Sequence, residues 1–108
     1  MNWLFLTTTQ QFDDMVSKST TAPVAIYKHS TRCSTCILLK RAIERDWESV
    51  HPTLPIYYLD LLAYRPVSDY IASQLSIAHE SPQVIVLKDG KAVYHASHAE
   101  IDIAAINA

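Results

Sequence analysis

The chain has 108 residues, the size of one ordinary domain, and we expect residues 1–108 to fold as a single domain around one core. Hydrophobic residues make up 49% of it and charged residues 19%, a balance that indicates a globular protein and excludes an intrinsically disordered one. The net charge is −2, and Lys and Arg form no long run, so we expect no nucleic-acid partner.

The first ten residues, MNWLFLTTTQ, carry no basic residue ahead of their four apolar residues, and this apolar run is too short for a secretory signal. No stretch reaches the roughly 18 apolar residues of a membrane span. We therefore expect a cytoplasmic protein with no membrane partner. In a reducing cytosol a disulfide is more often transient and catalytic than structural.

The first third of the chain predicts a strand, a helix and a second strand. Residues 3–6 (WLFL) predict a short strand, and the apolar spacing from Thr9 to about Lys18 predicts an amphipathic helix. Thr8 or Thr9 is expected to cap this helix. Residues 23–27 (PVAIY) form a continuous apolar run, which is typical of a central strand buried on both faces.

The middle of the chain predicts two helices separated by a strand. The strongest helix pattern extends from Cys33 to about Val50, where a broad apolar face lies opposite charged residues. Residues 55–61 (PIYYLDL) predict a hydrophobic strand. Ser68 to about Ala78 predicts a third helix, with Ser68 as its N-cap.

The last third predicts a hairpin and a closing helix. Residues 83–87 (QVIVL) indicate a strand, and Asp89-Gly90 after it is a strong hairpin pattern that contains the only glycine of the chain. The strand from Ala92 to His95 is then expected to return antiparallel. Residues from about His98 to Ile106 predict a closing helix.

Together these elements predict an α/β fold, because strands and helices alternate before the final hairpin. Right-handed crossovers place the strand at residues 23–27 near the centre of a mixed sheet of about four to five strands, covered by helices on both faces as a three-layer sandwich. The carboxyl end of that strand leads through residues 28–32 into the helix at Cys33. Active sites of open α/β sheets lie at such strand ends.

Both cysteines of the chain fall within YKHSTRCSTC, residues 27–36. Cys33 lies near the N-cap of the predicted helix, and Cys36 lies one turn later on the same face, close enough to form a disulfide. A Cys-x-x-Cys that follows a strand and opens a helix is typical of a thioredoxin-like redox motif. We therefore expect Cys33 to be the attacking nucleophile and Cys36 the resolving thiol.

The thiolate is the reactive form of cysteine, and the position of Cys33 favours it. Free backbone N–H groups and the helix dipole stabilise an anion at a helix start. The pKa of Cys33 is therefore expected to lie well below the roughly 8.5 of a free thiol. Three basic residues precede Cys33 within five positions and are expected to add positive potential: Lys28, His29 and Arg32.

The cysteine pair allows two other interpretations. The two thiols can be buried packing residues without chemistry. A structural zinc site needs four ligands, and here His29 would be the third ligand with no evident fourth. We therefore expect no metal site.

Ser81 and Pro82 stand just before the strand at residues 83–87. In a thioredoxin-like arrangement this proline faces the cysteine pair after a cis Ser81–Pro82 bond, and the backbone of Ser81 is free to pair with an extended substrate or a thiol adduct. The alternative is an ordinary proline at a strand start, since only roughly 5–6% of X-Pro bonds are cis.

The chain resembles the bacilliredoxins of the YtxJ type, a small family with the thioredoxin fold. The resemblance rests on YKHSTRC at residues 27–33, on the helix that follows, and on SPQVIVLKDGKAVYHASH at residues 81–98, and it extends over nearly the whole chain. Thioredoxin itself is a poorer match. It carries Trp-Cys-Gly-Pro-Cys and a buried acid six residues before the first cysteine, where this chain has Tyr27.

The resemblance implies an enzyme that reduces mixed disulfides between proteins and bacillithiol, a low-molecular-weight thiol used where glutathione is absent. It implies no cofactor, with bacillithiol or a similar thiol as co-substrate, and bacillithiolated or disulfide-bearing client proteins as partners. The attacking cysteine maps onto Cys33 and the substrate-contact proline onto Pro82. The other residues expected to contact the substrate are Ser81, His29, Arg32 and Thr31.

One departure from the family pattern concerns the second cysteine. The family commonly has a non-cysteine residue, often serine, where this chain has Cys36, and it acts through one thiol. A dithiol route is therefore open to this chain. A general thioredoxin-like protein disulfide reductase, a non-catalytic interaction module of the same fold and a metal-binding protein remain alternatives.

Overall fold

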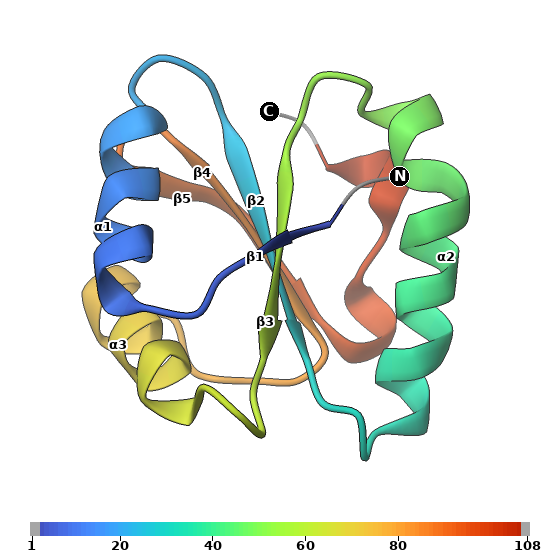
Figure 1. The fold of residues 1–108 in the computed structure, drawn as a ribbon. Helices are drawn as coiled ribbons and strands as arrows, with labels where there is room; N and C mark the ends of the chain where they lie inside the picture. Colours follow the sequence, from blue (N-terminus) through green and yellow to red (C-terminus); the bar gives the residue numbers. More distant parts are fainter. Residues whose placement is uncertain (1–2, 107–108) are drawn as a thin grey trace.

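The computed structural model describes residues 3–106, so the four terminal residues of the expected domain lie outside the described part. A five-stranded mixed sheet runs through its centre (Figure 1). The spatial order is β1-β3-β2-β4-β5. The strands are β1 (Leu4–Phe5), β2 (Val24–His29), β3 (Ile56–Asp60), β4 (Gln83–Lys88) and β5 (Lys91–Ser97).

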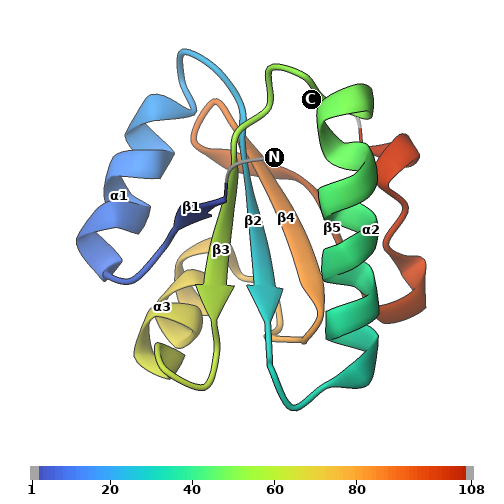
Figure 2. The same ribbon diagram turned by 45° about the vertical axis from the view of Figure 1, so that its right-hand side comes forward.

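Strand directions confirm the prediction of a mixed sheet with the 23–27 strand at its centre. β1 and β2 both pair parallel with β3, whereas β4 pairs antiparallel with β2 and β5 antiparallel with β4. Asp89 and Gly90 both have positive φ in the turn between β4 and β5, as the expected hairpin requires. The carboxyl ends of β2 and β3 therefore lie side by side at one edge (Figure 2).

Helices cover both faces of the sheet. α1 (Thr9–Lys18) and α3 (Arg65–Leu75) lie on one face, and α2 (Ser34–Val50) lies on the other, as Figure 1 shows. The C-terminal segment lies beside α2 with two 3₁₀ turns, η1 (His98–Glu100) and η2 (Ile103–Ala105). The predicted three-layer thioredoxin-like sandwich is confirmed.

Two buried clusters fill the spaces between the layers, and β2 contributes to both because its side chains alternate. Val24 and Ile26 pack toward α1 and α3, whereas Ala25 and Tyr27 pack toward α2. All six residues of β2 are buried, as a central strand requires. The start of α2 therefore follows directly from a strand that is packed on both faces.

The first helix begins with the predicted cap. The Thr8 hydroxyl accepts a hydrogen bond from the Gln11 N–H at 3.1 Å, and the Gln11 side chain accepts one from the Thr8 N–H at 3.1 Å. This reciprocal pair satisfies two backbone donors at the helix start.

The prediction that Ser68 caps the third helix is wrong. α3 begins at Arg65, and Tyr64 occupies the N-cap position without a side-chain hydrogen bond. Pro66 lies in the first turn, where its missing N–H costs nothing. Ser68 is instead buried one turn inside the helix.

The predicted closing helix is also wrong. Residues 98–106 form the two 3₁₀ turns, and the Asp102 carboxylate accepts a hydrogen bond from the Ala104 N–H at 3.0 Å. A helix of nine residues gains too few backbone bonds to offset its nucleation cost without broad packing. Here Ile106 alone is buried in this segment, among residues of the α2 cluster.

Candidate active site

The two cysteines lie where β2 ends and α2 begins (Figure 2). A tight turn joins the two elements: the Cys33 N–H donates to the Ser30 carbonyl at 3.1 Å, and the Arg32 N–H donates to the Ser30 hydroxyl at 3.3 Å. Thr31 and Arg32 are exposed on this turn. Cys33 then takes the extended N-cap conformation, with φ −107° and ψ 116°.

Cys33 is held as an activated thiol by the first turn of α2. Its sulfur accepts a hydrogen bond from the Cys36 N–H at 3.3 Å. Hydrogen bonds from the Cys36 thiol and backbone, followed by those from Thr35, lower the pKa of Cys33. The side chain is partly exposed, so its thiolate can meet a disulfide from solvent.

Cys36 has the opposite environment. It is fully buried, and burial raises the pKa of its thiol, against a smaller lowering effect from the Ser81 hydroxyl. That hydroxyl oxygen lies 3.3 Å from the Cys36 sulfur. Both cysteines are free thiols, and they exchange a hydrogen bond with each other. The pair therefore combines a partly exposed thiol of lowered pKa with a buried thiol of raised pKa that contacts it.

The loop before β4 borders the cysteines. Its Ser81–Pro82 peptide bond is cis, as expected. The Pro82 carbonyl accepts a hydrogen bond from the His98 N–H at 3.0 Å, and the Ser97 hydroxyl donates to the Glu80 carboxylate. These bonds attach the loop to the end of β5. Ser81, which contacts Cys36, is therefore held in place by both β4 and β5.

Tyr27 and His29 lie beneath the first turn of α2. The Tyr27 hydroxyl donates to the Cys36 carbonyl at 2.7 Å and lies 3.0 Å from Nδ1 of His29. His29 belongs to β2 and is only 2% exposed, so its side chain is not open to a substrate from solvent. Burial lowers its pKa, and the neutral ring adds no positive potential at Cys33.

The expectation that Lys28 adds positive potential at Cys33 is also wrong. β2 continues through His29, and its alternation sends the Lys28 side chain to the opposite face of the sheet. Its Nζ donates to the Ser68 carbonyl in α3 at 3.4 Å, and the side chain is fully buried. Of the three basic residues, only Arg32 is exposed beside Cys33.

No group of three His, Cys, Asp or Glu side chains within residues 3–106 is arranged to hold a metal ion. The ring of His29, the third ligand in the zinc alternative, contacts Tyr27 through Nδ1.

None of the helices within residues 3–106 is long and apolar enough to span a membrane.

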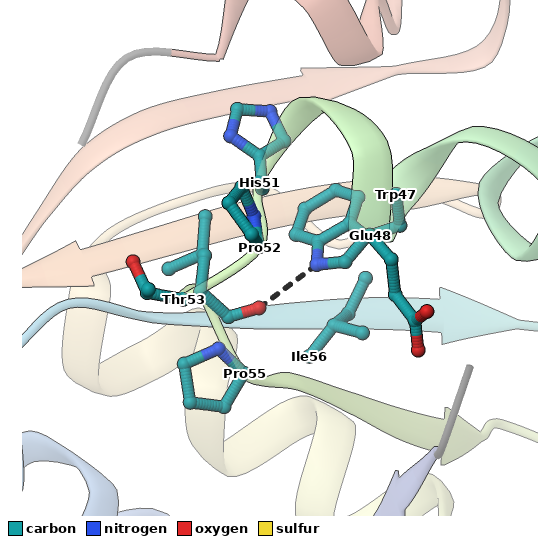
Figure 3. Close-up of a pocket in the computed structure, with 8 residues that line it drawn as sticks. Trp47, Glu48, His51, Pro52, Thr53, Pro55 and Ile56 are labelled. Atoms are coloured by element: carbon teal, nitrogen blue, oxygen red, sulfur yellow. Dashed lines mark hydrogen bonds between the residues drawn. The ribbon is translucent and has the colours of Figure 1, made fainter.

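A separate hollow of about 250 Å³ lies at the other end of α2. Figure 3 shows Trp47 and His51 at the helix end and Pro52, Pro55 and Ile56 in the segment that follows it, with Trp47 Nε1 donating to the Leu54 carbonyl at 2.8 Å. At 1.5 Å per residue, Trp47 lies about 20 Å along the helix from Cys33. This hollow is therefore separate from the cysteine site.

Sequence comparison assigns the chain to a family. Residues 5–106 match a family model described as monothiol bacilliredoxin BrxC. The match covers nearly all of the described residues, including both cysteines and the Ser81–Pro82 loop.

Solved structures show the same fold. One described as a putative oxidoreductase with a thioredoxin fold is 26% identical, with a TM-score of 0.81 over 93% of this chain and 86% of that one. A mutant thioredoxin from Halobacterium salinarum is 18% identical, with a TM-score of 0.67 over 93% and 80%. Thioredoxin from Fasciola hepatica is 18% identical, with a TM-score of 0.70 over 89% and 86%. With the family match, the cysteine geometry and the shared fold, the chain belongs to the monothiol bacilliredoxin BrxC family of thioredoxin-fold thiol-disulfide oxidoreductases.

Proposed function

We propose that this protein reduces mixed disulfides between cytoplasmic proteins and bacillithiol, with Cys33 as the nucleophile. The observation that carries the proposal is the state of Cys33: a partly exposed N-cap thiol whose pKa is lowered by hydrogen bonds from the first turn of α2. The family match supports the choice of small thiol. The partners are bacillithiolated or disulfide-bearing client proteins.

In the first step the Cys33 thiolate attacks the bacillithiol sulfur of the mixed disulfide. The bond between the client and bacillithiol breaks, the client cysteine leaves as a thiolate and takes a proton from solvent, and Cys33 becomes disulfide-bonded to bacillithiol. The client is reduced by two electrons and Cys33 carries the oxidised sulfur. A lowered pKa increases the fraction of Cys33 that is present as thiolate, which favours this attack.

The second step removes bacillithiol from Cys33. Cys36 loses its proton and attacks the Cys33 sulfur, which forms the Cys33–Cys36 disulfide and releases bacillithiol as a thiolate. Alternatively, a second molecule of bacillithiol attacks the bacillithiol sulfur bonded to Cys33. This frees Cys33 as a thiolate and forms oxidised bacillithiol. The first route regenerates the enzyme only after a reductant returns two electrons to the new disulfide.

The substrate contacts in this proposal surround Cys33. The backbone of Ser81 pairs with the extended client or adduct, Pro82 packs against it, and the exposed Thr31 and Arg32 border it on the other side. His29 was expected among these residues, but it is buried beneath the first turn of α2, which favours a different role.

Mass spectrometry of Cys33 tests the proposal. The reduced protein is exposed in parallel to oxidised bacillithiol and oxidised glutathione, and we expect a faster and larger Cys33 adduct with bacillithiol. Release of bacillithiol from a modified client is then measured for Cys36→Ser, which should complete the first step and accumulate the Cys33 adduct. Loss of the first step in Cys36→Ser, or no preference for bacillithiol, would contradict the proposal.

A general protein disulfide reductase is the second candidate, and the buried Cys36 thiol within reach of Cys33 favours it. Reduction of a protein disulfide that carries no small thiol distinguishes the two. Turnover of such a substrate at a rate equal to that of a bacillithiolated client would support the general reductase. Absence of turnover with either substrate would support a non-catalytic module.

A further inference from the structure

Tyr27 and His29 form a buried polar pair under the turn that carries Cys36. They lie two residues apart on β2, so both side chains face α2, and they are 0% and 2% exposed. One hydroxyl contacts two groups: Tyr27 Oη lies 2.7 Å from the Cys36 carbonyl oxygen and 3.0 Å from Nδ1 of His29.

The hydrogen count determines the direction of both bonds. A carbonyl only accepts, so the single hydroxyl hydrogen of Tyr27 is directed at Cys36. The contact with His29 therefore uses the ring N–H as donor and the phenol oxygen as acceptor. A neutral imidazole carries one proton, so in His29 that proton is on Nδ1.

The charge states of the pair agree with this arrangement. Burial lowers the pKa of His29, and the nearby Lys40 ammonium lowers it further, against smaller opposing effects of Asp60 and Glu44. Burial raises the pKa of Tyr27 above its usual range, so the phenol keeps the hydrogen that it donates. Both residues are neutral at physiological pH.

Two aromatic residues pack against the ring of Tyr27. Its ring stacks on Trp3 at 5.7 Å between centroids and meets Tyr58 edge-on at 6.3 Å. These contacts fix the ring but leave the rotation of the hydroxyl hydrogen free. Within residues 3–106, His29 Nδ1 and the Cys36 carbonyl are the hydrogen-bond partners of this hydroxyl, so His29 selects the direction of its hydrogen.

The turn around Cys36 is thus fastened at two atoms: Ser81 contacts its sulfur and Tyr27 contacts its carbonyl oxygen. We propose that His29 is a positioning residue that acts through the Tyr27 hydroxyl to hold Cys36 for the resolving attack on Cys33. The hydrogen bonds that lower the pKa of Cys33 come from Cys36 and Thr35, not from Tyr27 or His29, so the first attack depends on the pair only indirectly. This inference rests on the resolving role of Cys36 in the proposed function.

An aromatic disulfide reagent that releases coloured thionitrobenzoate separates the two steps. Attack by the Cys33 thiolate breaks the reagent disulfide, releases one thionitrobenzoate and leaves the other bonded to Cys33. Attack by Cys36 then forms the Cys33–Cys36 disulfide and releases the second. The two absorbance phases report the two steps without any client or bacillithiol.

Removing either member of the pair should slow only the second phase. We expect Tyr27→Phe and His29→Leu to slow it about tenfold and to leave the first phase within about twofold, because Tyr27→Phe removes the bond to the Cys36 carbonyl and His29→Leu removes the donor that orients it. His29→Asn should restore the second phase to within about twofold of the unchanged protein, because its amide N–H can replace the Nδ1–H donor.

A double variant tests whether His29 acts through Tyr27. In a Tyr27→Phe background, His29→Leu should slow the second phase no further. If the two residues acted independently, the fold-reductions of the two single variants would multiply in the double variant. His51→Leu is the control, since His51 is a partly buried histidine at the C-terminal end of α2, away from the cysteines, whose ring contacts the Ile103 carbonyl at 2.8 Å. Thermal unfolding of every variant separates lost stability from lost positioning.

Three results would overturn the inference: equal slowing of both phases, a full effect of His29→Leu in the Tyr27→Phe background, or failure of His29→Asn to restore the second phase. Absence of a second phase in the unchanged protein would also overturn it, because Cys36 would then not resolve. A missing preference for bacillithiol contradicts only the proposed substrate and leaves both absorbance phases unchanged, so the two failures are distinguishable.

Discussion

The hydroxyl oxygen of Ser81 lies 3.3 Å from the sulfur of Cys36, although 45 positions separate the two residues in the chain. The bond gives the buried thiol its one side-chain partner from the loop that borders the active site. Burial disfavours the Cys36 thiolate, and a hydroxyl donor favours it. Ser81 therefore partly offsets the effect of burial on Cys36 and favours the thiolate that the resolving step needs.

Replacing Ser81 by alanine should raise the pKa of Cys36 further, because the thiolate loses a donor. We expect the resolving step of Ser81→Ala to slow about three- to tenfold at pH 7, with the attack by Cys33 unchanged. The two-phase thiol release assay measures both rates. Ser73→Ala, at an exposed position of α3, is the control, and an unchanged resolving rate in Ser81→Ala would show that the hydroxyl is dispensable.

The reactivities of the two cysteines toward an alkylating reagent should depend differently on pH. The lowered pKa of Cys33 keeps its thiolate at a pH where the raised pKa of Cys36 keeps that thiol protonated. Iodoacetamide should therefore modify Cys33 first at neutral pH, as fragment-ion mass spectrometry of the peptide with both cysteines can show. Thr35→Val removes a hydrogen bond to Cys33 and should move its reactivity toward alkaline pH. Preferential modification of Cys36 would reverse the assigned roles.

Much of the site could be predicted from the sequence because it is local. An N-cap position and the first turn of a helix are set by neighbouring residues, so the spacing of Cys33 and Cys36 indicated their geometry correctly. The cis bond before Pro82 depended on the resemblance to a known fold, since local sequence favours the trans form.

Other features could not be predicted because they depend on distant partners or on how far a strand extends. β2 extends two residues beyond the expected Tyr27, and this extension buries Lys28 on one face and His29 on the other. The bond between the Tyr27 hydroxyl and the Cys36 carbonyl has no sequence pattern, because it forms only when α2 packs on β2. Ser68 resembled a cap, but Pro66 already fits the first turn of α3.

The cap of α1 offers a stability test away from the cysteines. Thr8→Ala removes the hydroxyl that accepts the Gln11 N–H, and we expect the free energy of unfolding to fall by about 0.5–2 kcal/mol. Thr9→Ala, at the neighbouring position, lacks this bond and should change stability much less. Urea denaturation measures both. Equal losses would show that the capping box contributes nothing specific.

The buried charge of Lys28 should make the free energy of unfolding increase as the pH rises above neutrality. Burial lowers its pKa from 10.5 to about 8, while its Nζ has only the Ser68 carbonyl at 3.4 Å as a hydrogen-bond partner in the described part of the chain. The unfolded chain therefore holds more protons than the folded one between about pH 8 and 10, so the free energy of unfolding increases with pH across this interval. Above it, the raised pKa of Tyr27 has the opposite effect, because the unfolded chain releases that proton first.

Lys28→Met removes the buried ammonium while keeping an unbranched side chain of similar length. We expect the free energy of unfolding at pH 7 to rise by about 1–3 kcal/mol, and the gain in stability between pH 8 and 10 to disappear. Lys91→Met, at an exposed position of β5, should show neither effect. Urea denaturation at a series of pH values measures both quantities. A less stable Lys28→Met at pH 7 would mean that the ammonium and the Ser68 carbonyl stabilise the fold by more than the burial of the charge costs.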